Sequence, residues 1–169
     1  MGGNVMFTIG DKVFYGAHGV CVIQDIQELS FSGQQKHYYV LHSYHDASIK
    51  LYHPVETEDS KLAPITSKKE AEGILEIFKN PPDVWQERMV DRSQHYQNIL
   101  ESKDHVQIAQ MMNTILRKKN ELEQDNKKLT NHDTQILKQV SPIFYEELAI
   151  SLELSVEEVM KRVEETIQN

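Results

Sequence analysis

The sequence is poor in several residue types, and each scarcity excludes a class of protein. A single cysteine, Cys21, excludes an internal disulfide and a zinc site built from several cysteines, so we expect a reducing compartment. Seven glycines and five prolines in 169 residues exclude collagen-like or linker-dominated chains. No apolar run approaches the roughly 18 residues of a membrane span, and residues 1–10 lack the features of a signal peptide, so we expect a cytoplasmic protein.

Basic residues are also outnumbered, which limits how the chain can meet nucleic acid. The 18 Lys and Arg against 26 Asp and Glu give a formal net charge of −8. Non-specific DNA affinity comes from neutralising phosphates, so a protein that coats nucleic acid through bulk charge is excluded. However, residues 139–169 hold 2 basic and 7 acidic residues, whereas residues 84–138 hold 9 and 8. A local DNA contact by the middle of the chain therefore stays open.

The motifs of common enzyme classes are missing as well. The chain has no phosphate-binding P-loop, no dinucleotide-binding glycine pattern, no Gly-x-Ser-x-Gly elbow and no His-Glu-x-x-His pair. Five of the eight histidines fall before residue 66, but their spacing matches no zinc class, and we interpret them as surface residues. Cys21 lies in an apolar run and is expected to be a buried side chain. We predict a binding protein without enzymatic activity, cofactor or metal.

The first part of the chain is patterned as short β-strands. Val, Ile, Tyr and Phe are enriched in four segments, and Ser32-Gly33 supplies a turn between the second and third: 12–15, 18–29, 36–42 and 49–54. The broken alternation around Ile23 is typical of a strand that bends. We predict a small SH3-like or Tudor-like β-barrel over residues 1–65. Residues 1–5, which precede Met6, are interpreted either as an extension or as native sequence.

The second part of the chain is patterned as helices. Capping boxes at Ser67 and Ser155 predict two helix starts, and Asp104 and Thr130 or Asn131 predict two more. Pro81-Pro82 interrupts the chain, and Asp83 is expected to cap a helix that runs to about Leu100. We predict an all-α bundle of about five helices over residues 66–169. The whole protein is then an α+β chain of two domains.

The predicted helix over residues 84–100 holds the first candidate binding residues. Its spacing places Trp85, Arg88 and Arg92 on one face. The next helix adds the basic run Arg117, Lys118 and Lys119. A mixed-charge face is often merely solvated, and a single Trp is often a core residue, so both interpretations stay open. An exposed Trp beside Arg is instead suited to wedging into or stacking on nucleic acid.

Five stretches of the sequence resemble one known family. The longest is Phe7–Ile23 (FTIGDKVFYGAHGVCVI); the others are residues 32–41, a strand that ends in Pro54-Val55, the region of Trp85 and Arg88, and LTNHD at 129–133 leading to EELA at 146–149. Together they resemble the CarD family of bacterial transcription regulators over nearly the whole chain from Met6. The first stretch is also similar to the polymerase-interaction domain of the transcription-repair coupling factor. That protein carries a motor ATPase, which this chain lacks.

The resemblance implies a regulator that binds RNA polymerase and promoter DNA. The Tudor-like domain would pair a strand with the polymerase β subunit, with contacts at Leu29, Phe31, Lys50 and Tyr52. The helical domain would contact promoter DNA at the upstream edge of the melted bubble, where Trp85 would act as a minor-groove wedge and stabilise the open complex. The cationic contacts would be Arg88, Arg92, Arg117, Lys118 and Lys119. Such a protein would associate with the nucleoid through polymerase.

The chain departs from the family pattern where charge matters. Glu87 and Asp91 offset the neighbouring arginines, so we expect weak DNA affinity that depends on tethering through polymerase. Leu29 and Tyr52 replace residues that are basic in some relatives, which leaves strand pairing as the main polymerase contact. The alternative function is a protein adaptor that never touches DNA. We expect a monomer, with a strand-exchanged dimer as the alternative.

Overall fold

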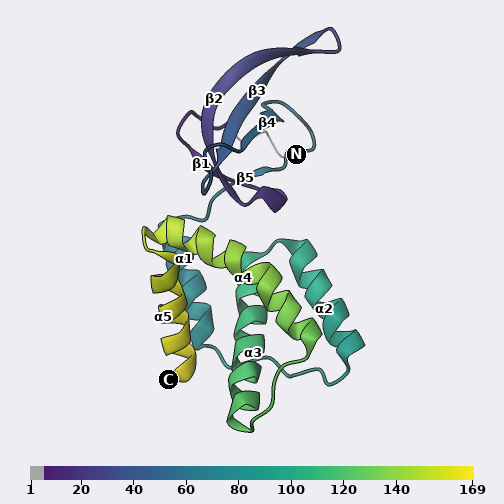
Figure 1. Ribbon diagram of the computed structural model, residues 1–169, viewed down its shortest axis with the longest axis vertical. Helices are drawn as coiled ribbons and strands as arrows, with labels where there is room; N and C mark the ends of the chain where they lie inside the picture. The colour runs from purple at the N-terminus through teal and green to yellow at the C-terminus, as the bar shows by residue number, and fades with distance from the viewer. Residues whose placement is uncertain (1–5) are drawn as a thin grey trace. The chain divides into compact units, whose positions relative to one another are not determined.

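The computed structural model describes residues 6–169, so the interpretation of residues 1–5 lies outside the described residues. The chain divides into two compact units, residues 1–65 and 66–169, which we call the sheet unit and the helical unit (Figure 1). Among the described residues, all β-strands lie in the sheet unit and all five α-helices lie in the helical unit. The prediction of an α+β protein with a β part followed by a helical part is confirmed.

The sheet unit contains one antiparallel sheet of five strands in the order β4-β3-β2-β1-β5. The strands are β1 (Lys12–Tyr15), β2 (Val20–Phe31), β3 (Gln34–Ser43), β4 (Lys50–Pro54) and β5 (Leu62–Pro64), with a short 3₁₀ turn, η1 (Gly16–His18), after β1. The sequence pattern did not predict β5. It has only three residues, and it is a strand because it pairs with β1, about fifty residues earlier, where Val13 faces Pro64.

The long hairpin of β2 and β3 is set by a two-residue turn and one bulge. Phe31 pairs with Gln34, and the turn residues Ser32 and Gly33 have φ of 53° and 77°, the left-handed values that a primed hairpin turn requires. The register shifts between Ile23 and Asp25, which confirms the bend that the broken alternation predicted. Figure 1 shows this hairpin rising beyond β4.

One face of the sheet covers a small apolar core. It consists of Phe7, Val13, Cys21, Ile23, Tyr39 and Leu41. The Tyr39 hydroxyl accepts a hydrogen bond from the backbone N–H of Phe7 at 3.0 Å, which attaches the segment before β1 to the core. Cys21 is fully buried, as the sequence predicted.

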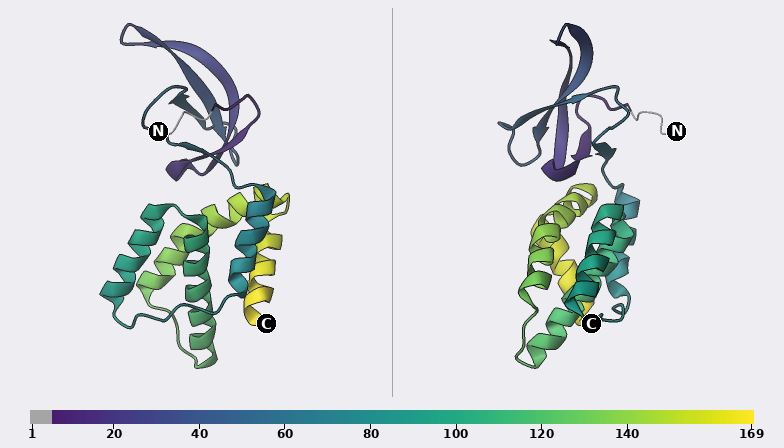
Figure 2. Two further views of the ribbon diagram at one scale, coloured as in Figure 1. Left: turned by 180° about the vertical axis from the view of Figure 1, so that it is seen from behind. Right: turned by 90° about the vertical axis from the view of Figure 1, so that its right-hand side faces the viewer.

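The helical unit contains α1 (Lys68–Glu76), η2 (Ile77–Lys79), α2 (Met89–Ser102), α3 (His105–Gln124), α4 (Asn131–Leu152) and α5 (Val156–Gln168), seen from three sides in Figures 1 and 2. Ser67, Asp104, Thr130 and Ser155 cap four of the helices through their side chains, as predicted. The predicted capping box is complete at Ser155 and Glu158, whereas at Ser67 only the serine half forms, with its side chain accepting from the N–H of Glu70. The core includes Phe78, Met112, Ile115, Leu148, Val159 and Val163.

The start of α2 differs from the prediction. The helix begins at Met89, so Asp83 caps no helix and Trp85 lies in an extended segment before α2. The physical reason is tertiary. The backbone N–H of Asp83 donates to Thr114 Oγ1 on α3, and Gln110 on α3 donates to the carbonyl of Pro81. Because these polar groups find partners on α3, the segment need not become helical to satisfy them.

Candidate functional site

The residues between the Pro pair and α2 form the first candidate site, and we call residues 81–88 the Trp85 segment. The Trp85 ring is half-buried and packs against the edge of the helical core. Two cations lie over it: the Arg92 guanidinium carbon at 4.6 Å and Lys118 Nζ at 5.5 Å from the ring centroid. The ring also borders a pocket of about 310 Å³. Trp85 is therefore neither a core residue nor a freely exposed one.

Arg92 is the residue that connects the Trp85 segment to the rest of the unit. It is only 5% exposed, although it was predicted on a DNA-facing surface. Nη1 donates to the carbonyls of Gln86 and Glu87 at 2.9 and 3.2 Å. Nε and Nη2 donate to the two carboxylate oxygens of Asp133 at 3.2 and 2.9 Å. All three guanidinium nitrogens are thus occupied inside the protein.

Asp133, on the first turn of α4, is completely buried. Its carboxylate also accepts from the Tyr96 hydroxyl at 3.0 Å and from Thr130 Oγ1 at 2.7 Å. Burial opposes ionisation, but the hydrogen bonds from Arg92, Thr130 and Tyr96 outweigh it and hold the pKa of Asp133 below its usual value. The carboxylate is charged at neutral pH and can hold the guanidinium in place.

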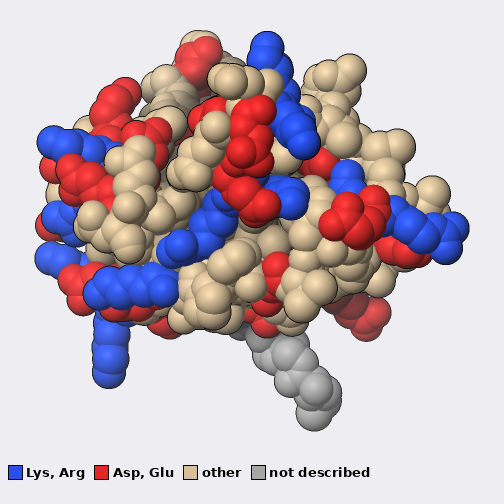
Figure 3. All heavy atoms as spheres, turned by 90° about the horizontal axis from the view of Figure 1, so that it is seen from below, with Lys and Arg blue, Asp and Glu red and all other residues tan. Residues whose placement is uncertain are grey.

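The other predicted DNA contacts differ in their availability. Arg88 is 79% exposed and only loosely paired with Asp91, at 3.9 Å. Lys119 is exposed, whereas Lys118 lies partly buried beside Trp85. Arg117 donates internally, to Asn113 Oδ1 at 2.9 Å and to the carbonyl of Phe78 at 2.7 Å. In the face drawn in Figure 3, Lys and Arg are interspersed with Asp and Glu, so no single-sign patch covers it.

An exposed apolar group beside Trp85 escaped the sequence reasoning. Val84 is 92% exposed, and Val90 and Met89, on the first turn of α2, are 69% and 50% exposed. The sequence placed residues 84–90 inside a helix, where some of these side chains would face the core. The Pro pair at residues 81 and 82 could have indicated the exposed segment, because two prolines can hold a chain extended as well as start a helix.

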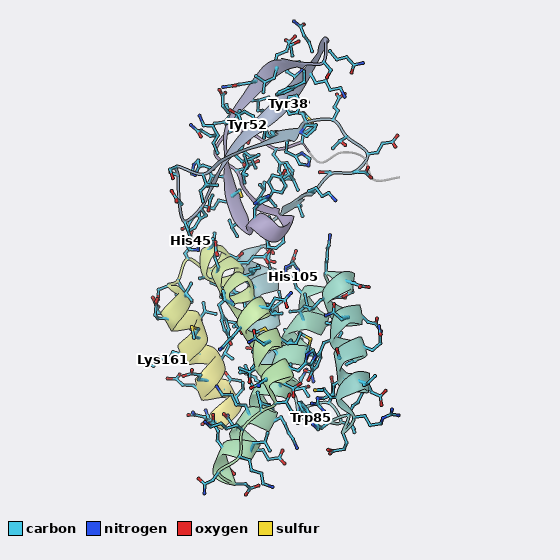
Figure 4. All side chains as sticks on the ribbon, turned by 45° about the vertical axis from the view of Figure 1, so that its right-hand side comes forward. Tyr38, His45, Tyr52, Trp85, His105 and Lys161 are labelled. Carbon is cyan, nitrogen blue, oxygen red and sulfur yellow. The ribbon has the colours of Figure 1, made fainter. Side chains whose placement is uncertain are left out.

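The four predicted polymerase contacts lie on one face of the sheet unit, spread along the length of β3. Leu29 pairs with Lys36, Phe31 with Gln34, Tyr52 with Val40 and Lys50 with His42. Paired residues of antiparallel strands share a face, and alternate residues of β3 share a face, so all four lie on the same side. This is the side opposite the core residues Tyr39 and Leu41. Figure 4 shows Tyr38 and Tyr52 on the sheet, and the Tyr38 ring meets Phe31 edge-on at 5.3 Å.

The strand β4 is also an edge of the sheet. In the described chain it pairs with β3 alone. His53 was interpreted as a surface residue, and this was wrong: it is buried and accepts from the backbone N–H of Lys61 at 3.0 Å, so it has a structural role. The described residues contain no cluster of metal-ligating side chains.

A second buried carboxylate, also missed by the sequence reasoning, lies near the other end of α4. Glu147 Oε1 accepts from the N–H and the hydroxyl of Thr66 at 3.2 and 3.0 Å, and Oε2 pairs with His105 Nε2 at 2.8 Å. Burial opposes its ionisation, but the hydrogen bonds from His105 and Thr66 prevail and lower the pKa of Glu147. Figure 4 shows His105 and Trp85 at opposite ends of the helical unit.

Comparison with known proteins identifies the family. The family model described as the CarD-like/TRCF RID domain matches residues 7–66, and the model described as the CarD C-terminal domain matches residues 73–164. A comparison with curated proteins finds no match. Within residues 6–169, no helix is long and apolar enough to cross a membrane. The two matches confirm the resemblance found in the sequence: the chain belongs to the CarD-like family, and it is a transcription-associated protein that interacts with RNA polymerase.

Proposed function

We propose that the sheet unit binds the β subunit of RNA polymerase and that the helical unit stabilises the promoter open complex through Trp85. The observation that supports the second half best is the position of Trp85. It lies on an extended surface segment outside every helix, beside the exposed Val84 and two cations. An apolar side chain at a partly unstacked base step stabilises a deformed duplex relative to a closed one. A protein with higher affinity for the open state raises its population without any chemistry.

The polymerase contact is supported by the edge strand β4 and the adjoining outer face. A partner strand can pair with the free backbone edge of β4, while side chains on the face give specificity. Leu29, Phe31, Lys50 and Tyr52 would supply those side chains. The mixed-sign surface of Figure 3 supports a DNA contact that depends on this tether.

The DNA-contacting set is smaller than the sequence suggested. We assign Trp85, Arg88, Lys118 and Lys119 to the DNA side. Arg92 and Arg117 direct their guanidinium groups to internal partners and are assigned to the support of the site. The proposed protein is a non-enzymatic monomer that acts on the nucleoid in the cytoplasm, and a strand-exchanged dimer remains the alternative assembly.

The proposed DNA contact is tested with Trp85→Ala on a promoter whose open complex decays quickly. We expect a shorter open-complex lifetime with unchanged retention on polymerase, and far-UV circular dichroism verifies the fold. An unchanged lifetime with intact polymerase binding would refute the wedge and support the adaptor function instead.

The proposed polymerase contact is tested by measuring the binding of the full chain to the isolated lobe of the polymerase β subunit. Tyr52→Ala should weaken this binding, because Tyr52 lies on the proposed face and is 47% exposed. Tyr44→Ala is the matched control, since Tyr44 is 43% exposed but lies outside β4. No binding by the unsubstituted chain, or equal loss in both variants, would remove this half of the proposal.

A further inference from the structure

The buried pair formed by Arg92 and Asp133 occupies an unusual place in the helical unit. Arg92 extends from α2 and touches three things at once: the Asp133 carboxylate on α4, the carbonyls of Gln86 and Glu87, and the face of the Trp85 ring. No other side chain in the described residues bonds to those two carbonyls. Gln110 and Thr114 of α3 hold the start of the Trp85 segment, at Pro81 and Asp83. The Arg92 guanidinium holds its end, next to Trp85, and links it to α4 through Asp133.

We infer that the Asp133–Arg92 pair is a positioning device that holds Trp85 in place before DNA is met. This inference rests on the proposed function of Trp85. The Trp85 segment has no helix or strand of its own, so its shape must come from contacts with its surroundings. Holding it in the bound shape beforehand removes the ordering cost that a loose segment incurs on binding.

The carboxylate end of the device is itself immobilised. Asp133 lies three residues after Thr130, the residue that caps α4, and the two side chains bond to each other while Asp133 N–H donates back to Thr130 Oγ1 at 3.2 Å. Tyr96 supplies a further donor from α2. Each carboxylate oxygen therefore accepts two hydrogen bonds, Oδ1 from Arg92 and Tyr96 and Oδ2 from Arg92 and Thr130, and all of them favour the orientation that faces Arg92.

Burial of this pair is better explained by specificity than by stability. Removing two charges from water is costly, and an apolar replacement of equal volume often serves stability as well. What an apolar pair could not supply is directed hydrogen bonding to two backbone carbonyls together with a planar group against an indole ring. Arginine provides that geometry, whereas lysine offers one point charge on a flexible stem.

The test uses Trp85 as its own reporter, because it is the only Trp in the chain. Asp133→Asn removes the charge that holds Arg92 and leaves Thr130, the residue that caps α4, in place. We expect the emission of Trp85 to shift to longer wavelength and its quenching by acrylamide to increase. Arg92→Lys, a milder variant for folding, should give the same two changes.

The matched control is Glu147→Gln. Glu147 is the other buried carboxylate of α4, and at 14 residues from Asp133 it lies about 21 Å along the helix axis. Its neutralisation should lower the melting temperature without altering Trp85 emission or quenching. Equal spectral change in Asp133→Asn and Glu147→Gln would overturn the inference, as would an Asp133→Asn spectrum identical to that of the unsubstituted chain.

A double-mutant cycle on open-complex lifetime separates positioning from general damage. Asp133→Asn should shorten the lifetime on its own and have no further effect once Trp85 is Ala, because it acts through that side chain. Additive losses would overturn the inference. If Trp85→Ala alone changes nothing, the proposed function fails, while the fluorescence result still decides whether Asp133 holds Trp85.

Discussion

The His105–Glu147 pair makes a pH-dependent contribution to the stability of the helical unit. Glu147 accepts the hydrogen bond from His105 Nε2 and, with smaller contributions from Asp104 and Glu70, raises the pKa of His105 despite its partial burial. A raised folded pKa stabilises the fold fully below the unfolded histidine pKa of about 6.5, and this stabilisation is lost as pH rises through the folded value. The pKa of Glu147 is lowered in the folded state. Its carboxylate therefore stays charged at pH values below about 4.3, the pKa of a glutamate in the unfolded chain.

The diagnostic substitution is His105→Gln, which keeps a hydrogen-bond donor but cannot titrate. The His105 side chain is 41% exposed, so the charged pair is screened. A surface pair contributes about 0–1 kcal/mol and a hydrogen bond to a charged group about 1.5–3 kcal/mol, so we expect about 1 kcal/mol here. For a unit of residues 66–169 this corresponds to about 4–8 °C in melting temperature.

The assay is thermal unfolding followed by Trp85 fluorescence, which reports on the helical unit alone because the sheet unit has no Trp. At pH 5.5 the unsubstituted protein should melt about 4–8 °C above His105→Gln, and at pH 9 the two should coincide. Comparing the two proteins cancels the titration of the other histidines. A difference that is the same at both pH values would refute the reasoning.

Three further predictions concern single side chains. Phe78→Ala should cost about 3–5 kcal/mol in the free energy of unfolding by urea, because Phe78 is fully buried against Phe144; a loss below about 1 kcal/mol would contradict the packing. Ser155→Ala should cost about 1 kcal/mol in the same assay by removing the capping box of α5, and an unchanged midpoint would argue against it. Arg88→Glu should shorten the open-complex lifetime and reduce its dependence on salt by about one counterion, whereas a salt-independent effect would exclude a phosphate contact.

Local signals in the sequence were sufficient for most element boundaries. Side-chain caps such as Ser67, Asp104 and Ser155 begin a helix through groups three residues away, so they can be recognised without knowing the fold. The same holds for the Ser32-Gly33 turn, whose left-handed backbone depends on the two turn residues. The family resemblance depends on such local stretches too, and it was confirmed.

Local signals failed where a partner far along the chain decides the structure. The Pro pair before Asp83 was interpreted as a helix start, but Gln110 and Thr114 of α3 hold that segment extended. Arg92 was placed on an outer face by its helical spacing. The spacing could not reveal that Asp133, 41 residues later, would draw the guanidinium inside.

The sequence alone therefore determined the two-part architecture, the family and the identity of Trp85 as a candidate contact. Periodicity, capping and turn formation act over a few residues, so the sequence records them directly. Only the tertiary structure decided which charges are available and what supports Trp85. The buried ion pair of Arg92 and Asp133 forms because α2 and α4 bring distant side chains together. The residue spacing within either helix cannot predict such a contact.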